Sequence, residues 1–159
     1  MEKDILGSGV AKEIEILEFR AGGNSYGVDV NDIREILPYQ KKSLPIPNAH
    51  PNIEGIIKPR DFLIPIVNFA QSLKLTEADE IKTEMLIVTS IANLNTAFHV
   101  DSVKGIHRVM TTDITKPGKK LSTTVKGAVL GILAREERKI EVVELRKIIN
   151  DINPQVNVG

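Results

Sequence analysis

Apolar and polar residues alternate along much of the chain, and this period of two is typical of β-strands. The clearest example is the stretch Tyr26, Val28 and Val30, in which every second residue is apolar. The chain contains no Trp, two Tyr and four Phe, so its core must be built mainly from Ile, Val and Leu. Because β-branched residues favour strands, the pattern predicts an all-β fold with an aliphatic core.

A proline-rich stretch and a hairpin follow these first strands. Residues 38–52 contain four prolines. Proline fixes φ and has no N–H to donate, so we expect an exposed, extended loop in this stretch. Residues 53–57 and 62–67 then have the pattern of two strands, and the charged residues 58–61 between them have the composition of a turn. The sequence therefore predicts a β-hairpin with a charged tip.

The second half of the chain repeats the order of the first. Residues 97–100 match residues 27–30, residues 125–129 match 53–57, residues 141–145 match 65–69, and a charged tip recurs at 135–138. Two diverged copies of one strand unit predict two subdomains, at about residues 14–80 and 81–154. A unit of five short strands hides its sheet edges by closing into a small barrel, so we expect one barrel per subdomain.

Helices and irregular segments complete the prediction. Residues 1–13 show no period and are expected to form a flexible lead-in, while residues 155–159 are expected to form a tail or linker. Phe69 and Leu73 stand four apart and predict a short helix. One face of a second helix is expected near the C-terminus, since the following apolar residues have helical spacing: Leu145, Ile148, Ile149 and Ile152. The fold class is thus all-β with short helices, one of them at the C-terminus.

The charge balance and composition exclude several classes of function. Lys and Arg together number 21, as do Asp and Glu, and this balance does not fit nucleic-acid binding, which usually needs a basic excess. The sequence has no apolar run near the roughly 20 residues that span a bilayer, so we expect no membrane insertion. The chain has no cysteine, which fits a reducing compartment. These features predict a cytoplasmic location.

The search for catalytic chemistry is mostly negative. No phosphate-binding loop, nucleophile elbow or paired-histidine motif is present. An enzyme that uses His50, His99 and His107 remains an alternative only if these side chains converge. Asp29, Asp32 and Glu35 are close enough in sequence to form an acid/base pair, but Asp29 is expected to face solvent because it alternates with apolar neighbours. Arg60 is a better candidate, since a guanidinium at a hairpin tip suits a partner's carboxylate or carbonyl groups.

Four segments form a recognisable pattern: Tyr26-Gly27-Val28-Asp29-Val30, Ile33-Arg34-Glu35-Ile36, Ile53-Glu54-Gly55-Ile56-Ile57-Lys58-Pro59-Arg60 and Pro65-Ile66-Val67-Asn68. Together they resemble the CheW-like coupling domains of bacterial chemotaxis, over roughly residues 14–154. Within that family the chain looks closest to the N-terminal domain of CheV, through His50-Pro51, Ile106-His107-Arg108 and residues 97–103 and 151–154. At the hairpin tip the family's usual Leu-Arg-Gly is replaced by Pro59-Arg60-Asp61, and its usual Asp after the hairpin is Asn68.

The resemblance implies two five-stranded, SH3-like barrels and a non-enzymatic adaptor without catalytic residues, cofactor or metal. The adaptor would link the cytoplasmic tips of methyl-accepting chemoreceptors to the regulatory domain of a CheA-type histidine kinase, at membrane-bound receptor arrays. A protein-binding scaffold of another bacterial signalling pathway is the alternative. The resemblance also implies five partner-binding residues: Ile33, Glu35, Ile36, Gly55 and Arg60.

Overall fold

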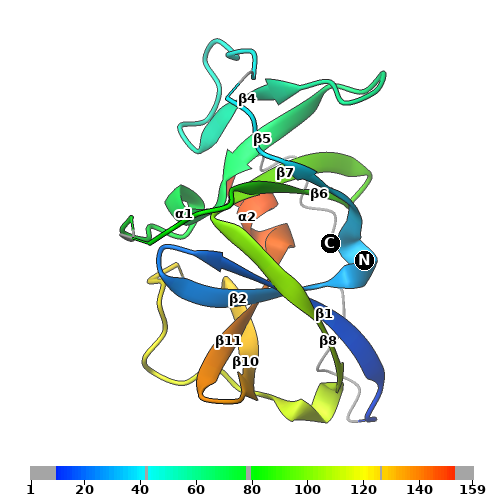
Figure 1. Cartoon of the computed structure of the whole chain (residues 1–159), viewed down its shortest axis with the longest axis vertical. Coiled ribbons are helices and arrows are strands. Elements are labelled where there is room, and N and C mark those ends of the chain that lie inside the picture. Colours follow the sequence, from blue (N-terminus) through cyan, green and yellow to red (C-terminus); the bar gives the residue numbers. More distant parts are fainter. Residues whose placement is uncertain (1–9, 42, 78–79, 126, 153–159) are drawn as a thin grey trace.

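The computed structural model describes residues 10–41, 43–77, 80–125 and 127–152. It shows two β-barrels stacked along the long axis of the molecule (Figure 1). The expected tail at residues 155–159 lies outside the described residues, as does most of the expected lead-in.

Each half of the chain contains strands followed by a short helix, in the predicted order. The first half comprises β1 (Glu13–Ala21), β2 (Asn24–Asp29), the 3-10 helix η1 (Val30–Asp32), β3 (Ile33–Pro38), β4 (Ile53–Ile57), β5 (Ile64–Asn68) and α1 (Phe69–Ser72). The second comprises β6 (Met85–Ile91), β7 (Leu94–Val100), β8 (Ser102–Met110), the 3-10 helix η2 (Thr111–Asp113), β9 (Ile114–Thr115), β10 (Val129–Arg135), β11 (Arg138–Val143) and α2 (Leu145–Ile152). The prediction of an all-β fold with a C-terminal helix is confirmed.

The two halves exchange strands, which the sequence analysis did not predict. In the described part of the chain, one sheet has the order β8-β1-β2-β11-β10-β9 and the other the order β3-β6-β7-β5-β4. Each sheet therefore contains strands from before and after residue 80, and the expected subdomains 14–80 and 81–154 do not each form a barrel. We call the barrel of the first sheet barrel A and that of the second barrel B. Barrel A also has the additional two-residue strand β9.

The pairing of the strands confirms the internal repeat. The parallel pair β2–β11 joins Gly27 to Val142, and the parallel pair β7–β5 joins Ala97 to Ile66, at corresponding positions of the two copies. The β4–β5 and β10–β11 hairpins each carry a β-bulge near the start of the first strand, next to Gly55 in β4 and next to Gly131 in β10. The counterpart of β4 is therefore β10. The proposed match of residues 125–129 to 53–57 was wrong by four residues, because the loop before β10 is longer.

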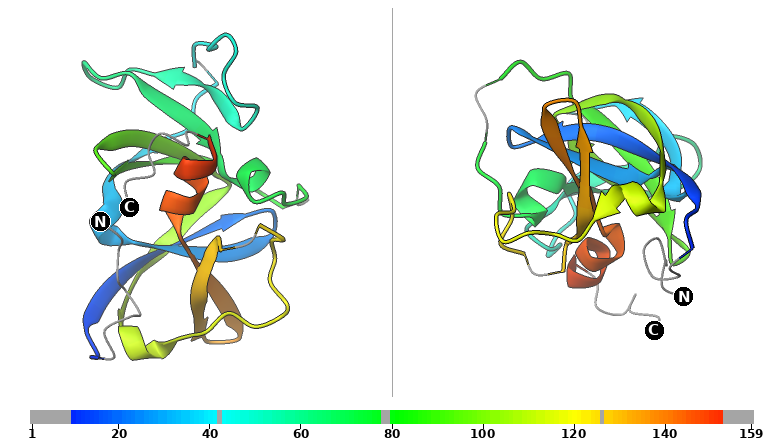
Figure 2. Two further views of the ribbon diagram at one scale, coloured as in Figure 1. Left: turned by 180° about the vertical axis from the view of Figure 1, so that it is seen from behind. Right: turned by 90° about the horizontal axis from the view of Figure 1, so that it is seen from below.

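The hydrophobic residues form a large core between the barrels and a smaller core inside each. Strand β1 shows how one strand serves two cores, because Ile16 packs inside barrel A while Leu17 packs into the central core. Seen from behind, α2 lies between the barrels, as Figure 2 shows. Its predicted apolar face is correct, since Leu145, Ile148 and Ile149 are buried. The central core also contains the four aromatic rings of Phe19, Tyr26, Phe69 and Phe98.

Candidate partner-binding surface

Strand β3 carries three of the predicted site residues and lies at one edge of the barrel B sheet. A β-bulge interrupts its pairing with β6 between Ile33 and Glu35. Because the bulge adds one residue to the alternation, Ile33 and Ile36 share one face although they stand three apart. Ile33 packs against the central core, and Ile36 is paired with Ile87 of that core. Glu35 points to the opposite face, towards the interior of barrel B.

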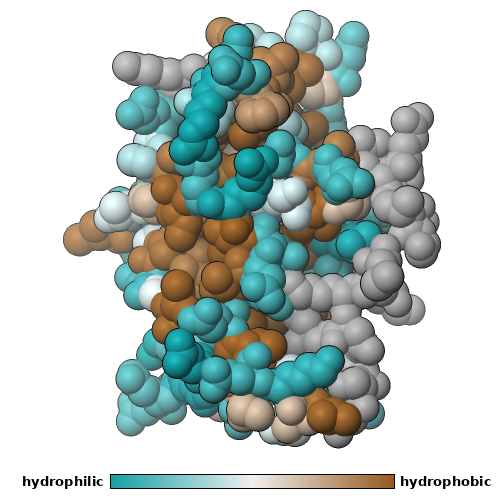
Figure 3. All heavy atoms as spheres, turned by 90° about the vertical axis from the view of Figure 1, so that its right-hand side faces the viewer, coloured by the Kyte–Doolittle hydropathy of each residue, from teal (hydrophilic) through white to brown (hydrophobic). Residues whose placement is uncertain are grey.

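Strand β8 repeats this arrangement at the edge of barrel A. Its pairing with β1 shifts at the same point, so that Val103 and Ile106 share the face next to the central core. Ile36 is 37% exposed and Ile106 is 56% exposed. Figure 3 shows apolar side chains gathered at this level, in the middle of the molecule. We call Ile33, Ile36, Val103 and Ile106 the junction surface.

A hollow of about 430 Å³ lies between β3 and β4, the two edge strands of barrel B. Leu37 from β3 and Ile57 from β4 contribute opposite walls. Leu44 and Leu63 complete the rim, and both side chains are more than half exposed. We call this opening and its rim the seam. It is an apolar recess on a surface of otherwise mixed polarity.

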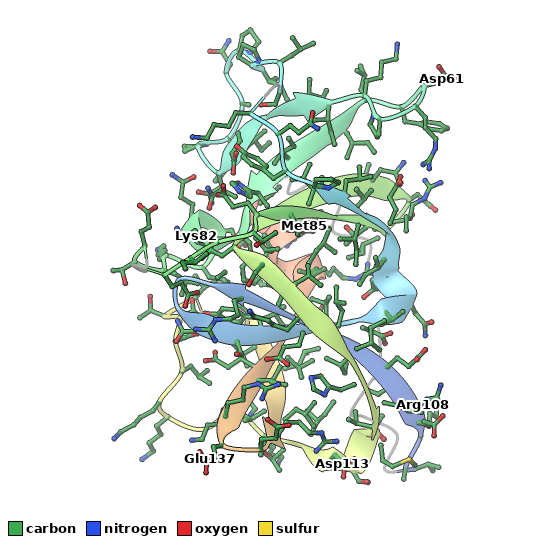
Figure 4. The ribbon with its side chains drawn as sticks, viewed as in Figure 1. Asp61, Lys82, Met85, Arg108, Asp113 and Glu137 are labelled. Carbon is green, nitrogen blue, oxygen red and sulfur yellow. The ribbon has the colours of Figure 1, made fainter. Side chains whose placement is uncertain are left out.

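Arg60 bridges the seam at the tip of the β4–β5 hairpin. Its Nη1 donates to Glu35 Oε2 at 2.6 Å. The side chain of Arg60 is nevertheless 69% exposed, whereas that of Glu35 is 23% exposed. The ion pair therefore orients the guanidinium while its remaining N–H groups stay accessible to solvent. Figure 4 shows the neighbouring Asp61 at the projecting tip of the β4–β5 hairpin, at the upper right.

Gly55 is buried and lies against the Ser43–Leu44 segment at the rim of the seam. A Cβ at this position would stand 2.5 Å from Ser43 Oγ and 2.8 Å from the Leu44 carbonyl oxygen. The absence of a side chain lets the Ser43–Leu44 segment lie against β4, where Leu44 and Ile56 form a β-bridge. Gly55 thus positions Leu44, and its own atoms are poorly placed for direct partner contact.

The hairpin tip of barrel A has an arginine with a different role. Arg138 donates from Nε and Nη2 to both carboxylate oxygens of Glu18, at 2.8 and 2.7 Å, and His107 Nε2 contacts the same carboxylate at 2.8 Å. The Glu18 side chain is only 2% exposed. The hydrogen bond from Arg138 is the main reason that the pKa of Glu18 is lowered to about 2, against the opposing effect of burial. Sequence reasoning missed Glu18, because a single Glu within an apolar strand gives no signal of burial.

The remaining polar candidates have separate structural partners. Asp29 is 5% exposed and accepts a hydrogen bond from Asn31 N at the start of η1, so the prediction that it faces solvent was wrong. His50 accepts from Asn52 N, whereas His99 contacts Glu54 and Glu84. Within the described residues, no group of three His, Asp or Glu side chains could hold a metal ion. No helix there is both long and apolar enough to cross a membrane.

Comparison with known proteins identifies the family. Residues 15–153 match the CheW-like domain. The chain belongs to the CheW-like domain family. The chemotaxis protein CheW of Thermotoga maritima is 30% identical over 150 residues, which cover 92% of this chain and 95% of the relative. The corresponding CheW of Rhizobium meliloti is 29% identical, over 84% of this chain and 86% of the relative.

A solved structure and a further relative also resemble the chain. The crystal structure of scaffolding protein TtCheW from Thermoanaerobacter tengcongensis has a TM-score of 0.76 at 22% identity, and the match covers 87% of this chain and 88% of that one. This likeness confirms the two-sheet arrangement. Chemotaxis protein CheV3 of Helicobacter pylori is 24% identical, over 88% of this chain and 48% of the relative. In keeping with its membership of the CheW-like family, the chain is non-enzymatic.

Proposed function

We propose that this CheW-like chain is a chemotaxis adaptor that couples the cytoplasmic tips of chemoreceptors to the regulatory domain of a CheA-type histidine kinase. It would act in the cytoplasm at membrane-bound receptor arrays. Family membership supports the coupling role, because the relatives are chemotaxis proteins. An adaptor also needs two surfaces that can be occupied at the same time.

The observation that carries the proposal is the bulged strand β3, which contributes to both surfaces. Its Ile33 and Ile36 belong to the junction surface, whereas Glu35 faces the seam and holds Arg60. We assign the junction surface to the receptor tip, because exposed isoleucines on two edge strands suit an apolar helix face. We assign the seam to the kinase domain, because an apolar recess beside an accessible arginine suits a partner that combines both contacts.

Arg60 is the stronger kinase contact of the two hairpin-tip arginines. Arg138 satisfies the buried carboxylate of Glu18 with two hydrogen bonds, so its binding capacity is largely used within the fold. Arg60 makes one such bond and remains exposed. The repeat has therefore kept an internal pair in barrel A and an accessible one in barrel B.

The closer resemblance to CheV stays a prediction. Identity to the CheV relative is 24%, compared with 30% for the Thermotoga CheW. Both kinds of protein share the CheW-like domain, so the proposed partners do not depend on this distinction.

Calorimetry with purified partners tests the proposal. The chain is titrated with a receptor-tip fragment, with the kinase regulatory domain, and with each partner in the presence of the other. We expect both partners to bind and neither to displace the other. Binding of neither would contradict the proposal and would favour a scaffold in another pathway, while mutual displacement would contradict the assignment of two surfaces.

A further inference from the structure

Three side chains from different segments meet around His99 at the foot of the β4–β5 hairpin. His99 lies on β7, and its Nδ1 contacts Glu54 of β4 while its Nε2 lies 3.0 Å from Glu84, just before β6. Tyr39, just after β3, stacks on the imidazole at a centroid distance of 3.6 Å and donates its hydroxyl to Glu54 at 2.8 Å. We propose that this His99 cluster makes kinase binding at the seam dependent on pH, with His99 as a positioning residue. The inference rests on the proposed function.

The contacts of the His99 ring favour the imidazolium form, in which both nitrogens carry a proton. Both imidazole nitrogens face carboxylate oxygens, which accept hydrogen bonds and cannot donate them when ionised. Only the imidazolium form has an N–H on each nitrogen. In neutral His99 one nitrogen carries a lone pair that faces a carboxylate, so one contact is lost. The other contact changes from a charge-assisted hydrogen bond to an ordinary one, which is weaker.

The surroundings of His99 raise its pKa. Burial by itself would lower the pKa of His99, but the hydrogen bonds and charges of Glu54 and Glu84 outweigh it and raise the pKa above the ordinary 6.5. The cluster therefore contributes its full stability below about pH 6.5 and loses it as the pH rises through the higher folded-state value. Burial raises the pKa of Tyr39 to about 12, so Tyr39 does not titrate in this range.

The other charged groups near His99 are one lysine and two carboxylates. A polar hollow of about 250 Å³ beside the ring is lined by Glu77, Lys82, Glu84 and Asp101. Lys82 lies 3.1 Å from Glu77 and 3.9 Å from Asp101, so its positive charge is directed at those carboxylates. Figure 4 shows Lys82 and Met85 at the waist between the barrels. On the neighbouring strand β5, the residue paired with His99 is the neutral Asn68.

The cluster holds the elements that form the seam. Glu54 directly precedes Gly55, which carries the Ser43–Leu44 segment at the rim. Tyr39 follows β3, and its backbone N–H donates to the Glu84 carbonyl at 3.1 Å. The contacts of protonated His99 thus tie β4 and the end of β3, the two walls of the seam, to the body of barrel B. Loss of the proton loosens that connection, and Arg60 is then held less firmly at the hairpin tip.

Nuclear magnetic resonance of the intact chain tests the cluster without any partner. The imidazole of His99 is titrated, and hydrogen exchange is followed at the backbone amides of β4. We expect a midpoint above 6.5 and, through the same transition, a fall in the protection factors of the β4 amides, which correct for the base-catalysed intrinsic rate. In His99→Gln, which cannot gain a charge, the pH-dependent change in these protection factors should disappear, while the control His50→Gln should retain it. A midpoint at or below 6.5 would overturn the inference. So would protection of the β4 amides that does not change as His99 titrates.

Affinity for the kinase regulatory domain is then measured at about pH 6 and about pH 9. We expect wild type and His50→Gln to bind about threefold to tenfold more weakly at the higher pH, and His99→Gln to show a much smaller change. Equal wild-type affinity at both values would refute the pH linkage alone. Absence of binding at every pH would instead refute the proposed function, so the two failures are distinguishable.

Discussion

Arg60 and Arg138 show how the surroundings of a residue decide its role. Both stand at the tip of a long hairpin and both pair with a glutamate. Glu18 is buried, and without Arg138 its carboxylate would keep only the contact with His107, which is a costly loss in a protein interior. Glu35 is partly solvated, and an exposed ion pair contributes about 1 kcal/mol or less. The same pair of residue types is therefore structural in barrel A and available for binding in barrel B.

Removal of each arginine's charge should affect stability to very different extents. We expect Arg138→Met to lower the urea midpoint of unfolding near neutral pH several times more than Arg60→Met does. The folded-state pKa of Glu18 is lowered to about 2, so the contribution of its pairing is present above the unfolded value near 4.5 and is lost as the pH falls. The deficit of Arg138→Met should accordingly shrink in acid, because protonated Glu18 no longer needs a cation. Equal effects of the two substitutions would contradict this difference.

Single-residue roles were only partly predictable from the sequence. The pattern indicated Arg60 as a tip residue, but its partner Glu35 lies 25 positions away and could not be inferred from spacing. The two departures from the family pattern have simple structural explanations. Among the described residues, five that are not glycine have positive φ, and Asp61 is not one of them, so the tip does not require glycine there. Asn68 accepts a hydrogen bond from Gln71 N and caps α1, as an aspartate could.

At the scale of elements, the β-bulge explains why β3 serves two surfaces. A regular strand would place Ile33 and Ile36 on opposite faces. The sequence did not predict the bulge, because an extra residue is visible only against the pairing partner. The repeat supplies independent support, since β8 has its irregularity at the equivalent position.

The junction surface makes a prediction at this scale. We expect Ile36→Ser and Ile106→Ser each to weaken binding of a receptor-tip fragment by about tenfold or more, because both remove apolar contacts at the centre of that surface. Thermal stability should change little, since both side chains are already partly exposed. Ile81→Ser is the matched control, because Ile81 is 98% exposed and belongs to neither β3 nor β8. Isothermal calorimetry measures the affinities, and normal binding by both junction variants would exclude this surface.

At the scale of the whole molecule, strand exchange joins the two barrels into one folding unit. Each sheet is complete only when both halves of the chain contribute strands, and the central core lies between the barrels. The sequence predicted the repeat, because its spacings reflect similar strands and turns. It could not predict the exchange, since hydrophobic alternation shows that a strand is buried but not which copy supplies its neighbour.

Exchange of strands predicts a single cooperative unfolding transition. We expect Leu133→Ala inside barrel A and Ile66→Ala inside barrel B each to destabilise the whole chain by about 2–5 kcal/mol. Scanning calorimetry should show one transition in both variants, displaced to lower temperature, with equal calorimetric and van't Hoff enthalpies. Two transitions, of which each substitution moves only one, would show that the barrels fold independently.

The most direct test of the account is the affinity of Arg60→Glu for the kinase regulatory domain. Arg108→Glu is a closely matched control, because the Arg108 side chain is 68% exposed on barrel A and that of Arg60 is 69% exposed on barrel B. We expect Arg60→Glu to weaken binding by about tenfold or more while its thermal midpoint stays close to that of wild type. Arg108→Glu should bind normally. Wild-type affinity in Arg60→Glu, or equal losses in both variants, would contradict the assignment of the seam as the kinase-binding surface.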